Sequence, residues 1–131
     1  PQDGYEQVDF DTLLAASDII SVHAPLNEYT ENLMNKEAFA KMKSSAIFLN
    51  VGRGPIVVEQ DLFEALENGE LAAAGLDVLC KEPIAADNPL LQIKDSRKLL
   101  ITPHIAWASV EARDRLVQMV LEQVQEYAKT R

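Results

Sequence analysis

The sequence predicts an α/β fold in which a parallel sheet is flanked by helices. Short apolar runs alternate with helical stretches along the 131 residues. Four of the runs are rich in β-branched or small residues and are followed by Pro, Gly or a polar residue, which is typical of strands. The run Ala-Ile-Phe-Leu-Asn at 46–50 does not alternate with polar residues, as expected of a strand in a parallel sheet covered on both faces. Strands that alternate with helices favour βαβ units.

Local signals give the order and the limits of the elements. Asp9 and Asn35 precede helical patterns and are suited to cap them, and Gly69 is suited to end a helix in the left-handed conformation. Pro25 stops the first strand, and two glycines beside Arg53 form a turn after the second. The expected strands cover 19–24, 46–50, 73–78 and 99–101. The expected helices cover about 9–15, 35–42, 59–68 and 109–131.

Composition and charge exclude several classes of protein. Hydrophobic residues make up 47% and charged residues 25%, which is ordinary for a folded globular chain. The net charge of −9 argues against nucleic acid or an anionic membrane as the main partner. A single cysteine forms no internal disulfide, and no run of about 18 apolar residues predicts a spanning helix. The polar start of the chain does not resemble a signal peptide, so a cytoplasmic setting is expected.

The residues just after each strand are the chemically richest, and ligands of parallel sheets bind beyond these strand ends. Arg53 is suited to hold a carboxylate through two hydrogen bonds, or it is a surface arginine in a turn. His104 is suited to donate a proton near neutral pH, with Glu82 to orient it. The alternatives are a packed histidine and a solvated loop glutamate. For His23, a structural role is favoured.

Metal binding and nucleophilic catalysis find no support in the residue pattern. The two histidines and the one cysteine are far apart and lack the spacing of metal ligands. The Gly-x-Ser-x-Gly motif of serine hydrolases is absent. Cys80 is expected to be a small buried residue rather than a reactive thiol.

Four segments together resemble the D-isomer-specific 2-hydroxyacid dehydrogenases, and their order and spacing fit this family over essentially the whole chain. The segments are Ser-Val-His-Ala-Pro-Leu at 21–26, Phe-Leu-Asn-Val-Gly-Arg-Gly at 48–54, Ala-Gly-Leu-Asp-Val at 74–78 with Glu-Pro at 82–83, and Thr-Pro-His-Ile-Ala-Trp at 102–107. The last segment, with Ala-Asp-Asn-Pro-Leu-Leu at 86–91, is most similar to the glycerate dehydrogenase (hydroxypyruvate reductase) branch.

The resemblance implies a role for each matching residue. Arg53 would bind the substrate carboxylate, His104 would protonate the carbonyl oxygen as hydride arrives, and Glu82 would keep His104 protonated. The substrate would be a small 2-hydroxy or 2-keto acid, and the cofactor NAD or NADP. The cofactor-binding residues implied are Ala24, Pro25, Thr30, Val51, Gly52, Arg53, Asp77 and His104.

One part of the family pattern does not occur in this sequence. The Gly-x-Gly-x-x-Gly motif that binds the pyrophosphate is absent. The resemblance therefore implies a partial Rossmann-like fold that lacks the first βαβ unit. Residues 1–108 would be the C-terminal part of the NAD(P)-binding domain, and residues 109–131 the returning C-terminal amphipathic helix of the family. A short strand over 5–8 would be the family's third strand.

Two consequences follow from the missing unit. The strand over 19–24 would have an unpaired edge, so the chain is expected to self-associate or to pair with a missing N-terminal half. NAD(P) binding by this chain alone is expected to be weak or absent, and turnover absent.

The functions that remain are a segment of a 2-keto acid-reducing dehydrogenase and a non-catalytic remnant or assembly module with the same fold. The presence of Arg53, Glu82 and His104 favours the first, and the missing motif favours the second. An unrelated α/β binding domain would require four coincidental matches.

Overall fold

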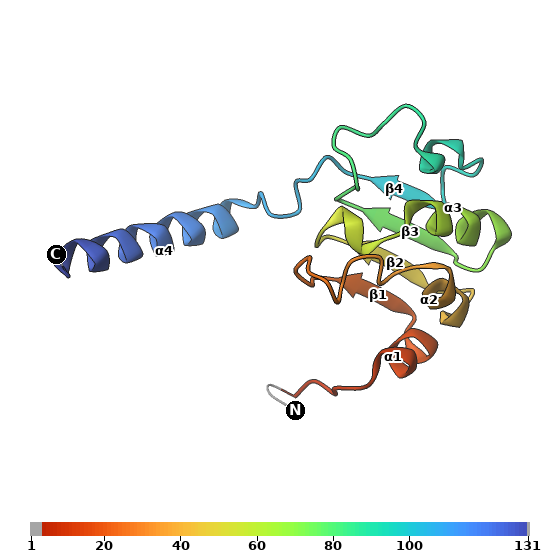
Figure 1. Cartoon of the computed structure of the whole chain (residues 1–131), viewed down its shortest axis with the longest axis horizontal. Coiled ribbons are helices and arrows are strands. Elements are labelled where there is room, and N and C mark those ends of the chain that lie inside the picture. The colour runs from red at the N-terminus through yellow and green to blue at the C-terminus, as the bar shows by residue number, and fades with distance from the viewer. Residues whose placement is uncertain (1–3, 131) are drawn as a thin grey trace.

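A computed structural model describes residues 4–130, and its centre is a four-stranded parallel sheet (Figure 1). The strands lie side by side in the order of the sequence. They are β1 (Ile19–Val22), β2 (Ile47–Asn50), β3 (Ala73–Leu76) and β4 (Leu99–Ile101). The predicted α/β fold with a parallel sheet and flanking helices is confirmed, and β1 lies at an edge of the sheet as expected.

The helices begin and end where the local signals place them. The Asp9 carboxylate accepts the backbone N–H of Thr12 at 2.9 Å, and Gly69 ends a helix with φ of 73°. The Asn35 side chain accepts two backbone N–H groups at the start of its helix. The α-helices are α1 (Phe10–Ala16), α2 (Lys36–Lys41), α3 (Glu59–Asn68) and α4 (Val110–Lys129), and the 3₁₀ helices are η1 (Gly54–Ile56) and η2 (Pro89–Gln92).

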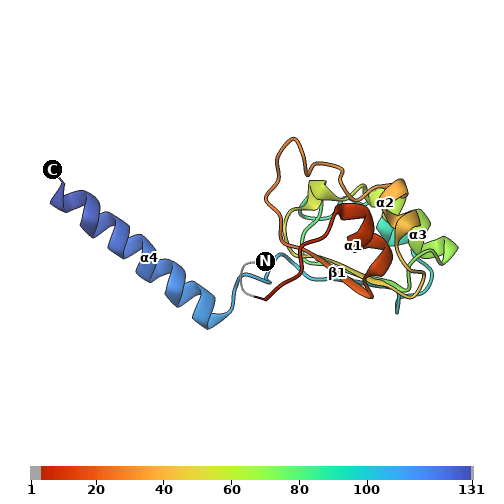
Figure 2. The ribbon, with the colours of Figure 1, turned by 90° about the horizontal axis from the view of Figure 1, so that it is seen from below.

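The core lies between the sheet and the three helices α1, α2 and α3, which cover the same face (Figure 2). Alternate strand residues such as Phe48 point into it, together with Leu14, Phe39 and Leu62 from the helices. The rings of Phe39 and Phe48 meet edge to face with centroids 5.5 Å apart. This aromatic pair joins α2 to the middle of the sheet.

The other face of the sheet has no helix on it, so the expectation that both faces are covered is wrong for the described residues. Ile19 is 60% exposed, and Leu100 is 66% exposed on the same face. The connectivity gives the reason. Each crossover between neighbouring parallel strands is right-handed as a rule, and strands added in one direction place all their connecting helices on one side.

Helix α4 projects away from the sheet and buries none of its residues (Figures 1 and 2). No helix within residues 4–130 combines the length and the apolar character that crossing a membrane requires.

Residues 5–8 form no strand, which contradicts the expectation from the resemblance. A strand needs a neighbour to accept its backbone hydrogen bonds. The two family strands that would stand between residues 5–8 and β1 have no counterpart among residues 4–130, so the segment stays irregular.

Candidate active site

Arg53, Glu82 and His104 follow three neighbouring strands at the carboxyl edge of the sheet. Arg53 comes after β2, Glu82 after β3 and His104 after β4. Because the strands are parallel, all three residues lie at the same edge of the sheet. This is the edge at which the strand-end segments were expected to gather.

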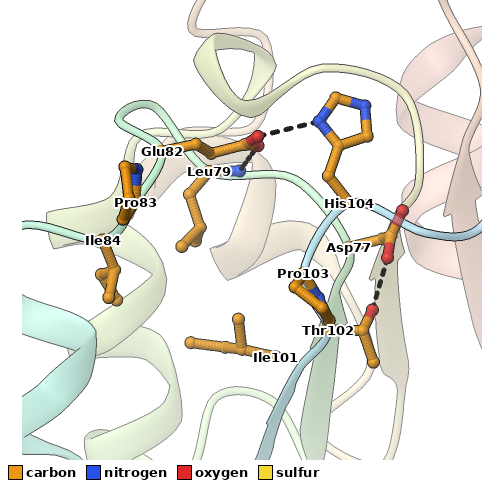
Figure 3. Close-up of a pocket in the computed structure, with 9 residues that line it drawn as sticks. All are labelled: Asp77, Leu79, Glu82, Pro83, Ile84, Ile101, Thr102, Pro103 and His104. Carbon is orange, nitrogen blue, oxygen red and sulfur yellow. Dashed lines mark hydrogen bonds and ion pairs between the residues drawn. The ribbon is translucent and has the colours of Figure 1, made fainter.

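Glu82 and His104 are in direct contact. His104 Nδ1 lies 2.8 Å from Glu82 Oε2, as the dashed line in Figure 3 marks. An ionised carboxylate only accepts hydrogen bonds, so Nδ1 carries the proton of this bond. The other ring nitrogen, Nε2, points away from Glu82 and is free to exchange a proton with a ligand.

Glu82 is held as a carboxylate by two donors. The backbone N–H of Leu79 donates to Glu82 Oε1 at 2.9 Å, and this bond is the main reason that the pKa of Glu82 lies below its usual value. The bond to His104 lowers the pKa of Glu82 further. Glu82 therefore stays charged near neutral pH and presents an acceptor to the imidazole.

The backbone of His104 has a left-handed φ of 56°, an uncommon value for a residue with a side chain. Asp77 holds the loop on both sides of it. Asp77 Oδ1 accepts the Thr102 hydroxyl at 2.5 Å and the N–H of Ile105 at 2.9 Å, and Oδ2 accepts the N–H of Ala106 at 2.8 Å. The side chain of Trp107 closes the loop by donating to the His104 carbonyl at 2.8 Å. Sequence reasoning missed this loop clamp.

The buried Asp77 remains ionised because of these hydrogen bonds. Burial acts to raise its pKa, but the bonds from Thr102, Ala106 and Ile105 outweigh burial and place the pKa below its usual value. Three of the roughly four acceptor positions of the carboxylate are used, which leaves one on Oδ2 for a further donor.

We expect Asp77→Asn to lower the free energy of unfolding by about 1–3 kcal/mol at pH 7. In either orientation of the amide, one of the N–H groups of the loop faces the Asn NH₂. Folding lowers the pKa of Asp77. Its contribution to the stability of the folded state is therefore present above the unfolded-state pKa of about 3.9, and it is lost as the pH falls through the folded-state pKa.

Urea unfolding followed by circular dichroism measures this difference. The difference in the free energy of unfolding between the native chain and Asp77→Asn should be smaller at about pH 2.5 than at pH 7. An equal difference at both pH values would contradict the conclusion that the Asp77 carboxylate holds the loop in its ionised form.

Arg53 lines a separate hollow of about 510 Å³ at the ends of β1 and β2. Its Nη1 donates to the Gly52 carbonyl at 2.8 Å, and no contact among the described residues joins it to Glu82 or His104. Since β3 lies between β2 and β4, the backbones of Arg53 and His104 are separated by about two strand spacings, roughly 10 Å. The three groups share the edge, but only Glu82 and His104 touch.

Most of the residues expected to bind a cofactor surround this Arg53 hollow. Its lining residues include Ala24, Pro25, Val51 and Gly52. Thr30 does not line it. The Thr30 hydroxyl donates to the Pro25 carbonyl at 2.7 Å and accepts the N–H of Asn27, so it shapes the loop that carries Pro25.

His23 is exposed, and its Nε2 lies 2.9 Å from the Ser21 hydroxyl. Cys80 is exposed too, so its expected burial is wrong. Partial desolvation of the thiol and the neighbouring Glu59 carboxylate raise the pKa of Cys80 to about 11, which keeps the thiol protonated and unreactive. Residues 4–130 contain no group of three or more His, Cys, Asp or Glu side chains suited to a metal ion.

Asn50, a residue that sequence reasoning missed, shapes the Arg53 turn. It is fully buried at the end of β2. Its Nδ2 donates to the Arg53 carbonyl at 2.9 Å and its Oδ1 accepts the N–H of Gly52 at 3.1 Å. The available signal was a polar residue that ends an otherwise apolar strand two positions before a glycine.

Gly54 and Glu59 tie the Arg53 turn to the loop that carries Glu82. A Cβ on Gly54 would lie 2.0 Å from the backbone of Leu79, so only glycine fits there. Glu59 accepts the N–H of Cys80 and the side-chain amide of Asn88, both at 2.8 Å. These contacts fix the loop after β3 against α3.

A third hollow of about 400 Å³ lies over β2, β3 and β4. Toward the strand ends it is lined by Val51, Asp77 and the Thr102, Ile105 and Ala106 segment. Apolar walls beside a carboxylate with one unused acceptor position fit a flat ring that carries an amide, such as nicotinamide. The motif for the pyrophosphate is absent from the sequence, so the residues present fit the nicotinamide end alone.

The fold and the site place the chain in the class of dinucleotide-binding α/β domains. Residues 1–106 match the family model described as the D-isomer specific 2-hydroxyacid dehydrogenase, NAD binding domain. The chain belongs to this family, as the four matching segments implied.

Curated relatives carry names from the same family. The chain is 51% identical over 122 residues to the hydroxypyruvate reductase of Blautia hydrogenotrophica, and the matched segment covers 93% of this chain and 37% of that protein. It is 42% identical to the glycerate dehydrogenase of Methylorubrum extorquens, over 97% of this chain and 40% of that protein. This chain therefore spans less than half the length of these relatives.

Solved structures are similar over nearly the whole chain. An acyclic imino acid reductase (Bsp5) in complex with NADPH and D-Arg matches 99% of this chain and 40% of its own, with a TM-score of 0.88 and 33% identity. The NAD-complexed D-isomer specific 2-hydroxyacid dehydrogenase of Lactobacillus delbrueckii ssp. bulgaricus matches 94% of this chain and 40% of its own, with a TM-score of 0.82 and 32% identity.

Proposed function

We propose that this chain carries the catalytic residues of an NAD(P)-dependent D-2-hydroxyacid dehydrogenase that reduces a small 2-keto acid such as hydroxypyruvate. The observation that carries the proposal is the 2.8 Å contact between His104 and Glu82 at the carboxyl edge of a parallel sheet. The names of the relatives, hydroxypyruvate reductase and glycerate dehydrogenase, support this choice of substrate. A cytoplasmic setting belongs to the same proposal.

His104 acts as the general acid for the keto oxygen. Reduction of a ketone builds negative charge on its oxygen, which a nearby protonated imidazole neutralises by giving up its proton. The bond from Nδ1 to Glu82 leaves Nε2 as the nitrogen that donates the proton. In the reverse direction, Nε2 takes the proton from the 2-hydroxyl group.

Arg53 binds the carboxylate of the substrate. Its side chain uses one donor on the Gly52 carbonyl, and a guanidinium offers five. The remaining donors suit a planar carboxylate, which accepts two parallel hydrogen bonds. The keto group of a bound 2-keto acid then lies between Arg53 and His104, which stand on either side of β3.

Asp77 and the residues around Arg53 would hold the cofactor. Bound NAD(P)H supplies the hydride. Ala24 and Pro25 would line the cofactor cleft, Gly52 would approach the nicotinamide ribose, and Asp77 Oδ2 would accept the carboxamide N–H. Without a pyrophosphate motif, we expect the 131-residue chain alone to bind NADH weakly or not at all.

The test is to complete the domain. We expect the chain mixed with a separately produced N-terminal portion of the Blautia hydrogenotrophica hydroxypyruvate reductase to oxidise NADH when hydroxypyruvate is added, followed by absorbance. Either part alone is the control and should be inactive. A complex that forms in sedimentation, binds NADH and yet shows no turnover would contradict the proposal.

The second candidate is a non-catalytic assembly module that keeps the dehydrogenase fold. The absence of the Gly-x-Gly-x-x-Gly motif from the sequence favours it. The inactive, NADH-binding complex just described is the result that this candidate predicts.

A further inference from the structure

The loop between β3 and η2 carries Glu82 without a helix or strand to hold it. Residues 77–88 form neither, and Glu82 is exposed. Its carboxylate nevertheless lies 2.8 Å from His104 Nδ1, and its second oxygen accepts the N–H of Leu79 at 2.9 Å (Figure 3). The place of Glu82 therefore depends on what fixes the backbone at residues 79–80.

Glu59 fixes that backbone from the first turn of α3. Its Oε1 accepts the N–H of Cys80 at 2.8 Å, and the preceding N–H, that of Leu79, donates to Glu82. Two consecutive N–H groups therefore point at two different carboxylates, one from the helix and one from the loop itself. Because the two planar peptide groups share the Cα of Leu79, a displacement of the Cys80 N–H also displaces the donor of Glu82.

The same carboxylate holds the far end of the loop. Glu59 Oε2 accepts the side-chain amide of the buried Asn88 at 2.8 Å, and Asn88 Oδ1 accepts the N–H of Leu90 at the start of η2. One side chain of α3 thus fastens residues 80 and 88, on both sides of Glu82. A loop that is fastened at both ends has fewer conformations open to it than a free loop.

Glu59 serves this loop rather than its own helix. Side chains at the start of a helix commonly accept hydrogen bonds from the unpaired N–H groups of the first turn. The N-cap of α3 is Val58, which supplies no side-chain hydrogen bond, and both oxygens of Glu59 accept donors from the loop. A local capping contact is replaced by a contact with a distant segment, which indicates a role at the site.

We propose that Glu59 is a positioning residue that keeps the Glu82 carboxylate against His104. The effect on turnover rests on the proposed function, whereas the effect on the imidazole concerns this chain alone. Without the contacts of Glu59, the loop relaxes and Glu82 spends less time against Nδ1. The neutral imidazole then carries its proton on either ring nitrogen, and Nε2 is no longer reserved for the substrate.

Substitutions at Glu59 and Asn88 break and then restore the two contacts. Glu59→Gln has one acceptor oxygen, so either the Cys80 N–H or the Asn88 amide faces an NH₂ group. Asn88 cannot turn over to avoid this without releasing the N–H of Leu90. Asn88→Asp alone places a second carboxylate against Glu59. In the double variant Glu59→Gln/Asn88→Asp, the new amide accepts the Cys80 N–H and donates to the new carboxylate, so both contacts return with donor and acceptor exchanged.

Glu67→Gln is the matched control. Glu67 also lies on α3, is partly buried, and accepts a backbone N–H of the same connection, that of Lys94, at 3.2 Å. This contact lies beyond η2 in the chain, on the side away from Glu82. The substitution therefore removes a similar bond between helix and connection without loosening the segment at residues 79–82. Urea unfolding verifies that each variant is folded.

Nitrogen-15 NMR of the imidazole rings in the 131-residue chain measures the effect on His104 without any turnover. The chain has two histidines, so the signals of His104 are those lost in His104→Gln, and His23 is the internal reference. At a pH at which both rings are neutral, we expect His104 to be mainly Nδ1–H in the native chain, in Glu67→Gln and in the double variant. The Nε2–H fraction should rise at least about threefold in each of the single variants Glu59→Gln and Asn88→Asp.

Turnover in the completed enzyme gives the second measurement. We expect Glu59→Gln to lower kcat for hydroxypyruvate by about tenfold or more and to change KM less, since Arg53 binds the carboxylate of the substrate. The double variant should return kcat to within about threefold of the native value.

The two measurements separate this inference from the proposed function. An unchanged His104 tautomer in Glu59→Gln, an equal change in Glu67→Gln, or a double variant no better than the single variants would overturn the positioning role. A completed enzyme that is inactive with the native chain, together with the expected NMR result, would contradict the proposed function and still support the positioning of Glu82 by Glu59.

Discussion

His104→Gln is expected to lower the turnover of hydroxypyruvate by about 10²–10⁴-fold in the completed enzyme, with little change in the binding of NADH. Glutamine can keep a hydrogen bond to Glu82 but has no proton to transfer at Nε2. The rate of NADH oxidation under saturating substrate measures the change. Because the loss is in proton transfer, it should appear in kcat more than in KM.

The matched control for His104 is the other histidine of the chain. His23→Gln should lower turnover far less than His104→Gln does, since the exposed His23 lines the Arg53 hollow but is bonded to Ser21 rather than to a carboxylate. Equal losses in the two variants, or an unchanged rate in His104→Gln, would remove His104 from the catalytic role.

Phe48→Ala is expected to lower the free energy of unfolding by about 3–5 kcal/mol, a large part of the stability of a domain of this size. Phe48 is fully buried in β2 and packs edge to face on Phe39. Its removal leaves a cavity between the sheet and α2 that the fixed backbone fills only partly. Urea unfolding followed by circular dichroism measures the loss.

Leu91→Ala is the control for the loss of core packing. Leu91 is 54% exposed, so its truncation should change the free energy of unfolding by less than about 1 kcal/mol. A comparable loss in both variants would show that the Phe39–Phe48 pair is not the centre of the core.

The elements were predictable because their signals are local. The Asp9 and Asn35 caps and the Gly69 stop each depend on contacts within a few residues, and all three form as expected. The expected strand over 5–8 does not form, because a strand depends on a neighbour that can be distant in the chain. Its residue pattern carries no information about whether that neighbour is present.

The site was predictable in its side chains but not in its supports. His104 and Glu82 belong to segments that the family resemblance identifies, and their contact follows from two neighbouring strand ends. The clamp of Asp77 on backbone N–H groups and the bond from Asn50 to the Arg53 turn were missed. Every residue except proline carries a backbone N–H group, so the identities of the residues do not indicate which N–H groups will donate to a side chain.

The amino-acid sequence by itself determined the order of strands and helices, the family, and the three charged side chains at the strand ends. The tertiary structure decided that Arg53 stands apart from the His104–Glu82 pair, that one sheet face is bare, and that α4 points away. The physical reason is the range of the interactions. Caps, turns and hydrophobic periodicity act within one element, whereas the side of the sheet on which helices pack depends on the handedness of every crossover together.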